Sequence, residues 1–513
     1  PPHTRGSGFG VRVPVPEPRS PIPDPRSPIP ESRIPELLIG GDREARLLKA
    51  LEVHREKGGV LLLVPEIEDA ESWAARLESA LDLPVRRLDS GQPVRVRQRA
   101  WEELADGTAR VAVGTRSALL APLALPTTLV LLDEHDPAHK PPGGARFHWR
   151  DGALARARAE GDRLLLVSAT PSVESWWQAE NGQFALREGA PAPWPSISVV
   201  DLRGRSHGIP LSPPLCQAVA DALKGGRQVL LLIAKVGAGL ACGECGFFFR
   251  CPECGIGLAY SRSASDLSCR LCRRRSTAPL TCPGCRGRRF STVGWSAEKV
   301  EEAVRRNFPG VSVTRYAGKS ARGAQNTAME RAIKDGTARV VIGTRAALKI
   351  VSPERLGTVG IITPDPLLRL PDFRAAERTF AFLWAAAESA GQGASLVVQT
   401  RHPDHYAVTA VAQQQLALFY KYELRYRAEL HYPPFSRLCR IAARATREGA
   451  ARVAIDQLAR GLSALPNVTV YGPSGAVPKT GGRRWQLVLK GGQDLPALLR
   501  GTLGAVLDRR RSG

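Results

Sequence analysis

The chain has 513 residues, enough for about three domains at roughly 100–200 residues each, and 43% of its residues are hydrophobic. Its formal net charge of +23 favours a polyanionic partner, above all nucleic acid. No run approaches the ~18 consecutive apolar residues of a membrane span, so we expect no such span. The chain opens on Pro1 and Pro2 rather than on methionine or a signal peptide, and we expect a fragment or a trimmed chain.

Residues 1–36 are rich in proline and arginine, and Pro-Arg-Ser-Pro-Ile-Pro occurs at 18–23 and again at 25–30. Proline at this density opposes helix and sheet, so the segment is predicted to be a disordered tail. From residue 37 onward, short apolar runs alternate with helical segments. The pattern predicts strands over 60–64, 111–113, 129–132 and 164–167 and a helix over 68–81. Alternating strands and helices predict a doubly wound α/β lobe over residues 37–205.

An internal repeat indicates a second, similar lobe. Residues 105–119 and 334–348 share eleven of fifteen positions, and both copies contain Gly-Thr-Arg after an apolar run. The carboxyl ends of parallel strands face the ligand crevice, so both motifs are predicted to lie on a functional edge. The guanidinium groups of Arg116 and Arg345 could bind phosphate oxygens there. The alternative is that each arginine pairs with a carboxylate of its own lobe.

Eight of the ten cysteines form four Cys-x-x-Cys pairs between the two repeats. Two such turns supply the four thiolates of a structural zinc site, so eight ligands predict two sites. The fourteen-residue gap between the second and third pairs favours a nested pairing. The first site would then use Cys242, Cys245, Cys282 and Cys285, and the second Cys251, Cys254, Cys269 and Cys272. Consecutive and crossed pairings are the alternatives.

The cysteine block is also basic and aromatic. Arg273, Arg274 and Arg275 follow the third pair, where arginines on a metal-held platform suit a phosphate backbone. Phe247, Phe248 and Phe249 could stack on an unpaired base or pack against the neighbouring lobe. Beyond residue 402, a helical stretch over 416–430 precedes strands near 439–443, 468–471 and 485–489, which predict a small α/β domain.

Further motifs make the chain similar to the PriA family (primosomal protein N′) of bacterial replication-restart proteins. Gly-Thr-Arg-Ser-Ala at 114–118 and Ser-Ala-Thr-Pro-Ser-Val-Glu-Ser at 168–175 match two of its motifs. Arg-Phe-His-Trp-Arg-Asp at 146–151 resembles the stretch after its Walker B motif, and Tyr-Pro-Pro-Phe at 432–435 and Gly-Pro at 472–473 match its C-terminal domain. The resemblance covers residues 36–500. It does not include the family's N-terminal domain, which captures the 3′ end of a nascent strand.

The resemblance implies two RecA-like doubly wound lobes, with a two-zinc four-cysteine ribbon block inserted in the second lobe and a small C-terminal α/β domain. The expected domains are the tail (1–36), the first lobe (37–205), the start of the second lobe (206–241), the zinc block (242–290), the rest of the second lobe (291–402) and the C-terminal domain (403–513).

The nucleotide-binding motifs depart from the family. A P-loop reads Gly-x-x-x-x-Gly-Lys-Ser/Thr, whereas this chain has Gly40, Gly41 and Asp42, with Arg43 at the lysine and Glu44 at the hydroxyl position. In the Walker B region, the magnesium aspartate is either replaced by Leu132 or, after a one-residue deletion, retained as Asp133 beside Glu134. The arginine-finger motif is replaced by Trp-Ala-Ala-Ala-Glu at 384–388.

We therefore expect a protein that binds forked or single-stranded DNA at stalled forks and helps to reload the replicative helicase, without helicase activity. The residues expected to contact DNA are Arg116, Arg146, Arg150, Arg345, Arg273, Arg274 and Arg275. The expected cofactors are two Zn²⁺, and the degenerate motifs make ATP doubtful. The resemblance implies primosome components and single-stranded-DNA-binding protein as partners, a monomer, a cytoplasmic, nucleoid-associated location, and links to DNA repair and recombination. The alternatives are an ATP-driven 3′→5′ helicase with an unconventional nucleotide site and a zinc-ribbon protein that binds RNA or RNA polymerase.

Overall fold

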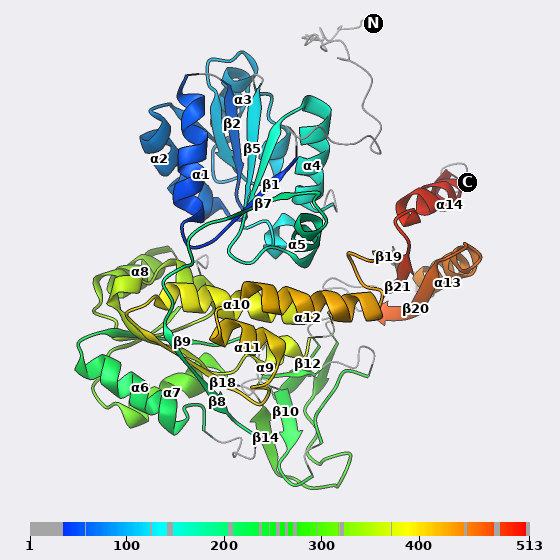
Figure 1. Ribbon diagram of the computed structural model, residues 1–513. Helices are drawn as coiled ribbons and strands as arrows, with labels where there is room; N and C mark the ends of the chain where they lie inside the picture. The colour runs from blue at the N-terminus through cyan, green and yellow to red at the C-terminus, as the bar shows by residue number, and fades with distance from the viewer. Residues whose placement is uncertain are drawn as a thin grey trace, which may run out of the picture. The chain divides into compact units, whose positions relative to one another are not determined.

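The structure is a computed structural model (Figure 1). It describes residues 34–508 except 57, 124–125, 141–146, 204–208, 235–238, 246, 253–256, 262–264, 270–273, 294, 317, 319–322, 371, 446–448 and 477–482. Most of the predicted tail lies outside this range. Residue contacts divide the chain into two compact units, and each is described by itself. The first holds Leu47–Val167 with the residues up to Leu37, and the second holds Leu38–Arg46 with the residues from Ser168 onward.

The first unit is built on a parallel sheet. Its elements are β2 Gly59–Leu63, α2 Ile67–Leu81, β3 Val85–Leu88, α3 Val94–Ala105, β4 Val111–Gly114, β5 Thr127–Leu132, α4 Trp149–Glu160 and β6 Arg163–Val167, with 3₁₀ helices at Glu52–Arg55, Arg116–Leu120 and Pro137–His139. The strands follow the order β3-β4-β2-β5-β6 and continue into β1 Glu36–Ile39. Every residue of β2 and β5 is buried, as expected of parallel strands covered on both faces.

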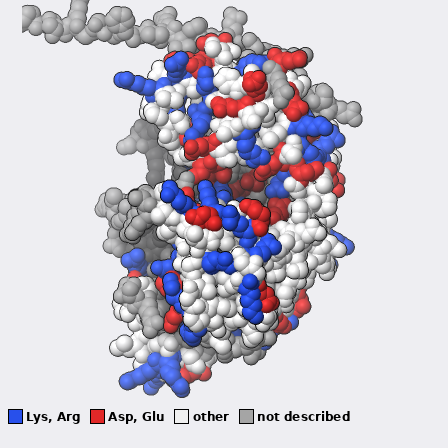
Figure 2. All heavy atoms as spheres, turned by 90° about the vertical axis from the view of Figure 1, so that its left-hand side faces the viewer, with Lys and Arg blue, Asp and Glu red and all other residues white. Residues whose placement is uncertain are grey.

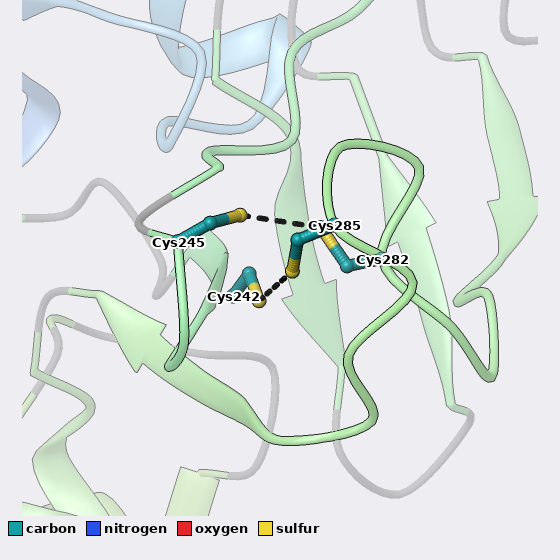
Figure 3. Close-up of side chains that lie close together, drawn as sticks. All are labelled: Cys242, Cys245, Cys282 and Cys285. Carbon is teal, nitrogen blue, oxygen red and sulfur yellow. Dashed lines mark hydrogen bonds between the residues drawn. The ribbon is translucent and has the colours of Figure 1, made fainter.

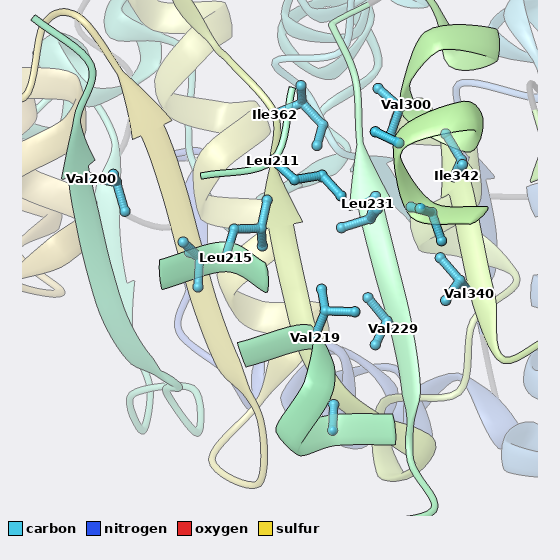
Figure 4. Packing of buried hydrophobic residues seen from close by; sticks show 14 residues of the cluster. Val200, Leu211, Leu215, Val219, Val229, Leu231, Val300, Val340, Ile342 and Ile362 are labelled. Carbon is cyan, nitrogen blue, oxygen red and sulfur yellow. The ribbon is translucent and has the colours of Figure 1, made fainter. Parts of the chain in front are cut away.

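The second unit contains another parallel sheet, in the order β15-β16-β9-β17-β18-β8. Its elements are α5 Val173–Glu180, β7 Ala185–Glu188, β8 Ser196–Asp201, α6 Pro213–Lys224, β9 Gln228–Leu232, α7 Ala297–Asn307, β15 Val313–Tyr316, α8 Gly323–Asp335, β16 Val340–Gly343, β17 Leu356–Ile361, α9 Asp365–Leu368, α10 Ala375–Ala390 and β18 Ser395–Thr400, with 3₁₀ helices at Arg345–Lys349 and Pro353–Arg355. Leu215 and Val219 of α6, Val229 of β9 and Val300 of α7 meet in its core (Figure 4). α1 Arg43–Leu51 begins in this unit and ends in the first. In the order of strands, β1 lies between β6 and β7.

The cysteine block forms a separate antiparallel sheet between β9 and α7. Its strands are β10 Gly239–Cys242, β11 Ala259–Ser261, β12 Asp266–Ser268, β13 Arg275–Thr277 and β14 Phe290–Val293, in the order β13-β12-β11-β10-β14. Because β9 is a strand of the second parallel sheet and α7 packs on that sheet, the block is an insertion in that lobe, as the sequence predicted.

The C-terminal part contains a small antiparallel sheet in the order β19-β21-β20. The elements are α11 Tyr406–Ala412, α12 Leu416–Glu429, β19 Arg437–Ala445, α13 Ala450–Ser463, β20 Thr469–Ala476, β21 Arg483–Gly491 and α14 Leu495–Asp508. Ile455 and Leu462 of α13 and Leu487 and Leu489 of β21 are buried together, so the helix covers one face of the sheet.

The two repeat copies fold alike, which confirms the inference of two similar lobes. β4 and β16 each end in glycine, and threonine then leads into a 3₁₀ helix. A Cβ on Gly114 would lie 2.6 Å from the Cβ of Ala118, and one on Gly343 would lie 2.5 Å from that of Ala347. Glycine is therefore required by the close approach of the 3₁₀ helix to the strand end.

The fold class is the predicted one: two RecA-like α/β lobes with an inserted ribbon and a small C-terminal domain. In the first sheet, the strand before the expected phosphate loop, β1, is one strand removed from the Walker B strand β5. No helix among the described residues is long and apolar enough to cross a bilayer. On the face seen in Figure 2, basic and acidic side chains are interspersed, so net charge alone does not locate a DNA path.

Candidate nucleotide remnant and metal centre

The loop at the position of the P-loop is short. β1 ends at Ile39 and α1 begins at Arg43, so only three residues separate strand from helix, in place of the longer Gly-x-x-x-x-Gly turn. The backbone N–H of Gly41 donates to the carbonyl of Ala190 at 2.7 Å. A Cβ on Gly41 would meet the Cα of Ala192 at 2.4 Å. The glycine that could approach a phosphate instead approaches the chain's own backbone.

Arg43, at the position of the P-loop lysine, forms a two-pronged ion pair with Glu388. Its Nη1 and Nη2 donate to Oε1 and Oε2 of Glu388, each at 3.0 Å. The two side chains are only 16% and 19% exposed. Glu388 also accepts a hydrogen bond from the indole N–H of Trp384, and Arg43 donates to the carbonyl of Gly40. The guanidinium charge is therefore already neutralised by a carboxylate on the last turns of α10.

A second, more deeply buried charge network begins at the other end of α10. Arg374 donates to Glu174 of α5 at 2.9 Å and to Glu377 at 2.8 Å. Arg427 of α12, 2% exposed, donates to Glu377 and to Glu423, both at 2.8 Å. Burial raises the pKa of Glu377, but Arg374 and Arg427 outweigh it and hold the pKa well below its usual range.

This network fixes the segment at 168–175 that resembles the family motif. The backbone N–H of Val173 donates to Glu377 at 3.0 Å, and the hydroxyl of Tyr420 donates to the carbonyl of Pro171 at 2.6 Å. These partners were not predicted from the sequence. The available signal was an acidic and a basic residue four positions apart on a helix, Glu423 and Arg427. Such pairs are common on exposed helices, so this one did not indicate a buried network.

The Walker B residues lie in the first unit. Glu134 is fully buried, and Arg150 donates to its carboxylate at 3.2 Å. Arg150, predicted to contact DNA, is itself 9% exposed, so its guanidinium is occupied inside the lobe. Leu132 ends β5 and is buried, whereas Asp133 follows it in a left-handed conformation with φ of 45°. The carboxylate nearest the strand end is therefore that of Asp133.

The other predicted arginines differ in exposure. Arg116, Arg274 and Arg275 are exposed, and Arg345 is half-buried. Arg146 and Arg273 lie outside the described residues.

Four cysteines from opposite ends of the ribbon converge on one point. The Sγ atoms of Cys242, Cys245, Cys282 and Cys285 all lie within 4.8 Å of one another (Figure 3). Cys242 and Cys285, and likewise Cys245 and Cys282, are 3.6 Å apart at sulfur. A tetrahedral Zn²⁺ with Zn–S bonds of about 2.3 Å has S···S edges of about 3.8 Å, so the donor set fits that ion. The structure thus brings the first and fourth pairs together to form a cluster that could hold a metal ion.

Backbone geometry prepares these sulfurs to act as ligands. The N–H of Glu244 donates to Sγ of Cys242 at 3.4 Å, and that of Gly284 to Sγ of Cys282 at 3.3 Å. Hydrogen bonds from the backbone at Cys245 and Glu244 lower the pKa of Cys242 to about 7. The thiolate of Cys242, the form that binds metal, is therefore accessible at neutral pH, whereas hydrogen bonds with the neighbouring thiols raise the pKa of Cys245 and of Cys285.

The second predicted site is only half described. Cys251 and Cys269 are both 1% exposed and belong to one buried cluster, whereas Cys254 and Cys272 lie outside the described residues. Phe249 is 7% exposed in the same cluster, so it packs inside the ribbon. Phe247 is 39% exposed and is the phenylalanine of this segment most open to a ligand.

The chain is similar in sequence to proteins named replication restart protein PriA. Residues 428–512 match the family model of the primosomal protein N C-terminal domain. The replication restart protein PriA of Bacillus subtilis is 27% identical over 481 residues, which cover 90% of this chain and 60% of that protein. PriA of Haemophilus influenzae is 29% identical, covering 88% and 64%, and PriA of Treponema pallidum is 29% identical, covering 88% and 70%. Among solved structures, the DUF1998 helicase MrfA bound to DNA is 12% identical, with a TM-score of 0.41 over 76% of this chain and 46% of that chain.

Two RecA-like lobes with a four-cysteine ribbon inserted in the second define a helicase-like protein with a candidate metal centre. The chain spans less than two thirds of the length of the first two relatives. Along nine tenths of its length the chain is similar to the replication restart proteins named PriA, and its C-terminal part matches the primosomal protein N C-terminal domain.

Proposed function

We propose that this chain is a replication-restart protein that binds branched or single-stranded DNA at stalled forks and promotes reloading of the replicative helicase, without ATP-driven unwinding. The restart and DNA-binding parts of this proposal rest on the relatives, which are named replication restart proteins. The absence of a motor rests on the chain's own residues.

The Arg43–Glu388 ion pair is the observation that carries the loss of ATP hydrolysis. In a working P-loop, backbone N–H groups and a lysine receive the phosphates, and an arginine finger approaches the γ-phosphate in the transition state. Here the residue at the lysine position is bonded to a glutamate that stands in the arginine-finger segment. Phosphate would have to displace a carboxylate from Arg43 and would meet the repulsion of Glu388 itself.

The ribbon is proposed to carry two Zn²⁺ ions. Cys242, Cys245, Cys282 and Cys285 would hold the first, and Cys251, Cys254, Cys269 and Cys272 the second. Zinc bound by four thiolates acts structurally, because no open coordination position is left for a substrate. Its cross-links would fix the small ribbon, whose strands of three or four residues bury little apolar surface.

The exposed arginines Arg116, Arg274 and Arg275 are the proposed phosphate contacts, and Arg345, Arg146 and Arg273 remain proposals on sequence grounds. Primosome components, single-stranded-DNA-binding protein and a monomeric state belong to the same proposal. So does a cytoplasmic, nucleoid-associated location.

The test combines DNA binding and ATP turnover on the zinc-loaded chain. Fluorescence anisotropy with a labelled fork, the matching linear duplex and a single-stranded RNA of the same length measures preference, and phosphate release with and without the fork measures hydrolysis. The proposal expects fork binding stronger than duplex or RNA binding and no fork-stimulated phosphate release. Strand separation that requires ATP would establish a motor, and preference for the RNA would move the protein to another class.

A further inference from the structure

One face of α12 presents two rows of side chains to solvent. Tyr422 is 41% exposed and Tyr426 is 48% exposed, and each is preceded by an exposed cation, Lys421 or Arg425. Residues four apart lie one above the other on a helix, about 6 Å along its axis. The helix therefore carries a row of two rings and, beside it, a row of two cations.

A third ring holds the tyrosine pair in place. Tyr406, at the start of α11, stacks on Tyr422 with ring centroids 5.9 Å apart and on Tyr426 at 5.6 Å, with interplanar angles of 29° and 28°. The Tyr406 hydroxyl donates to Glu423 at 2.7 Å, and Glu423 accepts in turn from buried Arg427 at 2.8 Å. The aromatic surface is thus anchored in the buried charge network that also fixes Glu377.

The rings of Tyr422 and Tyr426 are both exposed and held in place, so a ligand that covers them would not have to order them first. Rigid rings lose little conformational freedom on binding, which favours them as contact surfaces. Among the described residues, Arg425 forms an ion pair with Glu429, and the two side chains are 74% and 54% exposed. Such a pair contributes little stability, so Arg425 can exchange its partner for another anion at small cost.

We propose that Tyr422 and Tyr426 form a stacking platform for unpaired bases of single-stranded DNA, with Lys421 and Arg425 on the adjoining phosphates. Stacking requires only the faces of bases, so the platform would bind without reading sequence. A double helix hides those faces between its own base pairs, so the platform would favour unpaired strand. This inference rests on the proposed function, because it assumes that DNA is the ligand. It adds a binding site for the single-stranded arm of a fork.

The decisive experiment measures binding of fluorescein-labelled oligo(dT) to the zinc-loaded chain and to variants. Tyr422→Ala and Tyr426→Ala should each weaken binding on the order of tenfold, and the double variant should weaken it further. Tyr422→Phe keeps the ring and should stay within about twofold of the parent. Tyr471→Ala is the matched control, because Tyr471 is 50% exposed but belongs to a different element, the strand β20.

Two further measurements separate stacking from charge. An oligomer of the same length with abasic sites should bind the parent chain on the order of tenfold more weakly and should bind the tyrosine variants no worse than it binds the parent. Lys421→Ala should lower the slope of log affinity against log salt concentration by about one, whereas Tyr422→Ala should leave that slope unchanged.

The inference is overturned if the double tyrosine variant binds oligo(dT) as tightly as the parent, or if the abasic oligomer binds as well as oligo(dT). It is also overturned if the double variant keeps full DNA affinity but loses binding to single-stranded-DNA-binding protein, because the surface would then be a protein interface. A parent chain that binds neither fork nor oligo(dT) would defeat the proposed function as well. Fork binding that is normal in the parent and unchanged in the double variant would defeat only the platform.

Discussion

The ion pair between Arg43 and Glu388 gives a quantitative prediction. Two unit charges about 4 Å apart attract by about 4 kcal/mol at an effective dielectric constant near 20. Partial dehydration of both groups offsets some of this attraction. Exposed pairs are worth about 0.2–1 kcal/mol, and removing one partner of a fully buried pair costs about 3–5 kcal/mol. With side chains 16% and 19% exposed, this pair should fall between these limits, with a coupling free energy of about 2 kcal/mol.

A double-mutant cycle with Arg43→Ala and Glu388→Ala measures that coupling. The readout is hydrogen exchange of a peptide spanning residues 38–47, which contains the N–H of Gly41 bonded to Ala190. Local exchange is preferred to global unfolding because a chain with two compact units need not unfold in one step. With a coupling of about 2 kcal/mol, the double variant would open roughly thirtyfold less than the sum of the two single effects predicts, because each single variant already loses the whole ion pair.

The control is the exposed pair Arg306 and Glu302 on α7, with both side chains 73% exposed, for which about 0.5 kcal/mol or less is expected. A coupling at Arg43 and Glu388 no larger than this control would refute the reasoning. So would slower exchange of residues 38–47 in the parent chain on adding Mg²⁺ and ATP, because a bound ligand stabilises the state that it binds.

Three further predictions concern stability and metal. Gly343→Ala should destabilise the second unit by about 1–3 kcal/mol, because the new Cβ would lie 2.5 Å from that of Ala347. Gly461→Ala, in open space on α13, should instead stabilise the protein by about 0.5–1 kcal/mol. Urea unfolding measures both changes, and equal shifts would contradict the packing argument. Burial raises the pKa of Asp162 from 3.8 to about 6, so its contribution to stability is present below about pH 3.8 and is lost as pH rises through about 6. Asp162→Asn should therefore remove the fall in the free energy of unfolding over this pH range. An unchanged fall in the variant would assign it to other groups. Cys242→Ser should reduce bound zinc, measured by elemental analysis, from two ions per chain to one, and loss of both ions would show that the sites are not separable.

The sequence by itself determined the elements and their order. Buried parallel strands are continuous apolar runs, so β2, β4, β5 and β6 could be predicted within one or two residues from local composition. The repeated Gly-Thr-Arg motif indicated two similar lobes, and the cysteine spacing favoured the pairing of first with fourth that the structure shows for one cluster. Each of these signals is carried by residues close together in the chain, or by a ligand chemistry that admits few arrangements.

Only the tertiary structure decided how distant charges are paired. The sequence showed that Arg43 replaces a lysine and that Glu388 stands where arginine is usual, but 345 positions separate them and nothing local links the two changes. The tyrosine platform was hidden for the same reason, because Tyr406 and Tyr426 come from different helices and α12 reads as an ordinary helical stretch. Charge pairing and ring stacking act over a few ångströms in space and leave no period in the sequence, so they become visible only when the helices have packed.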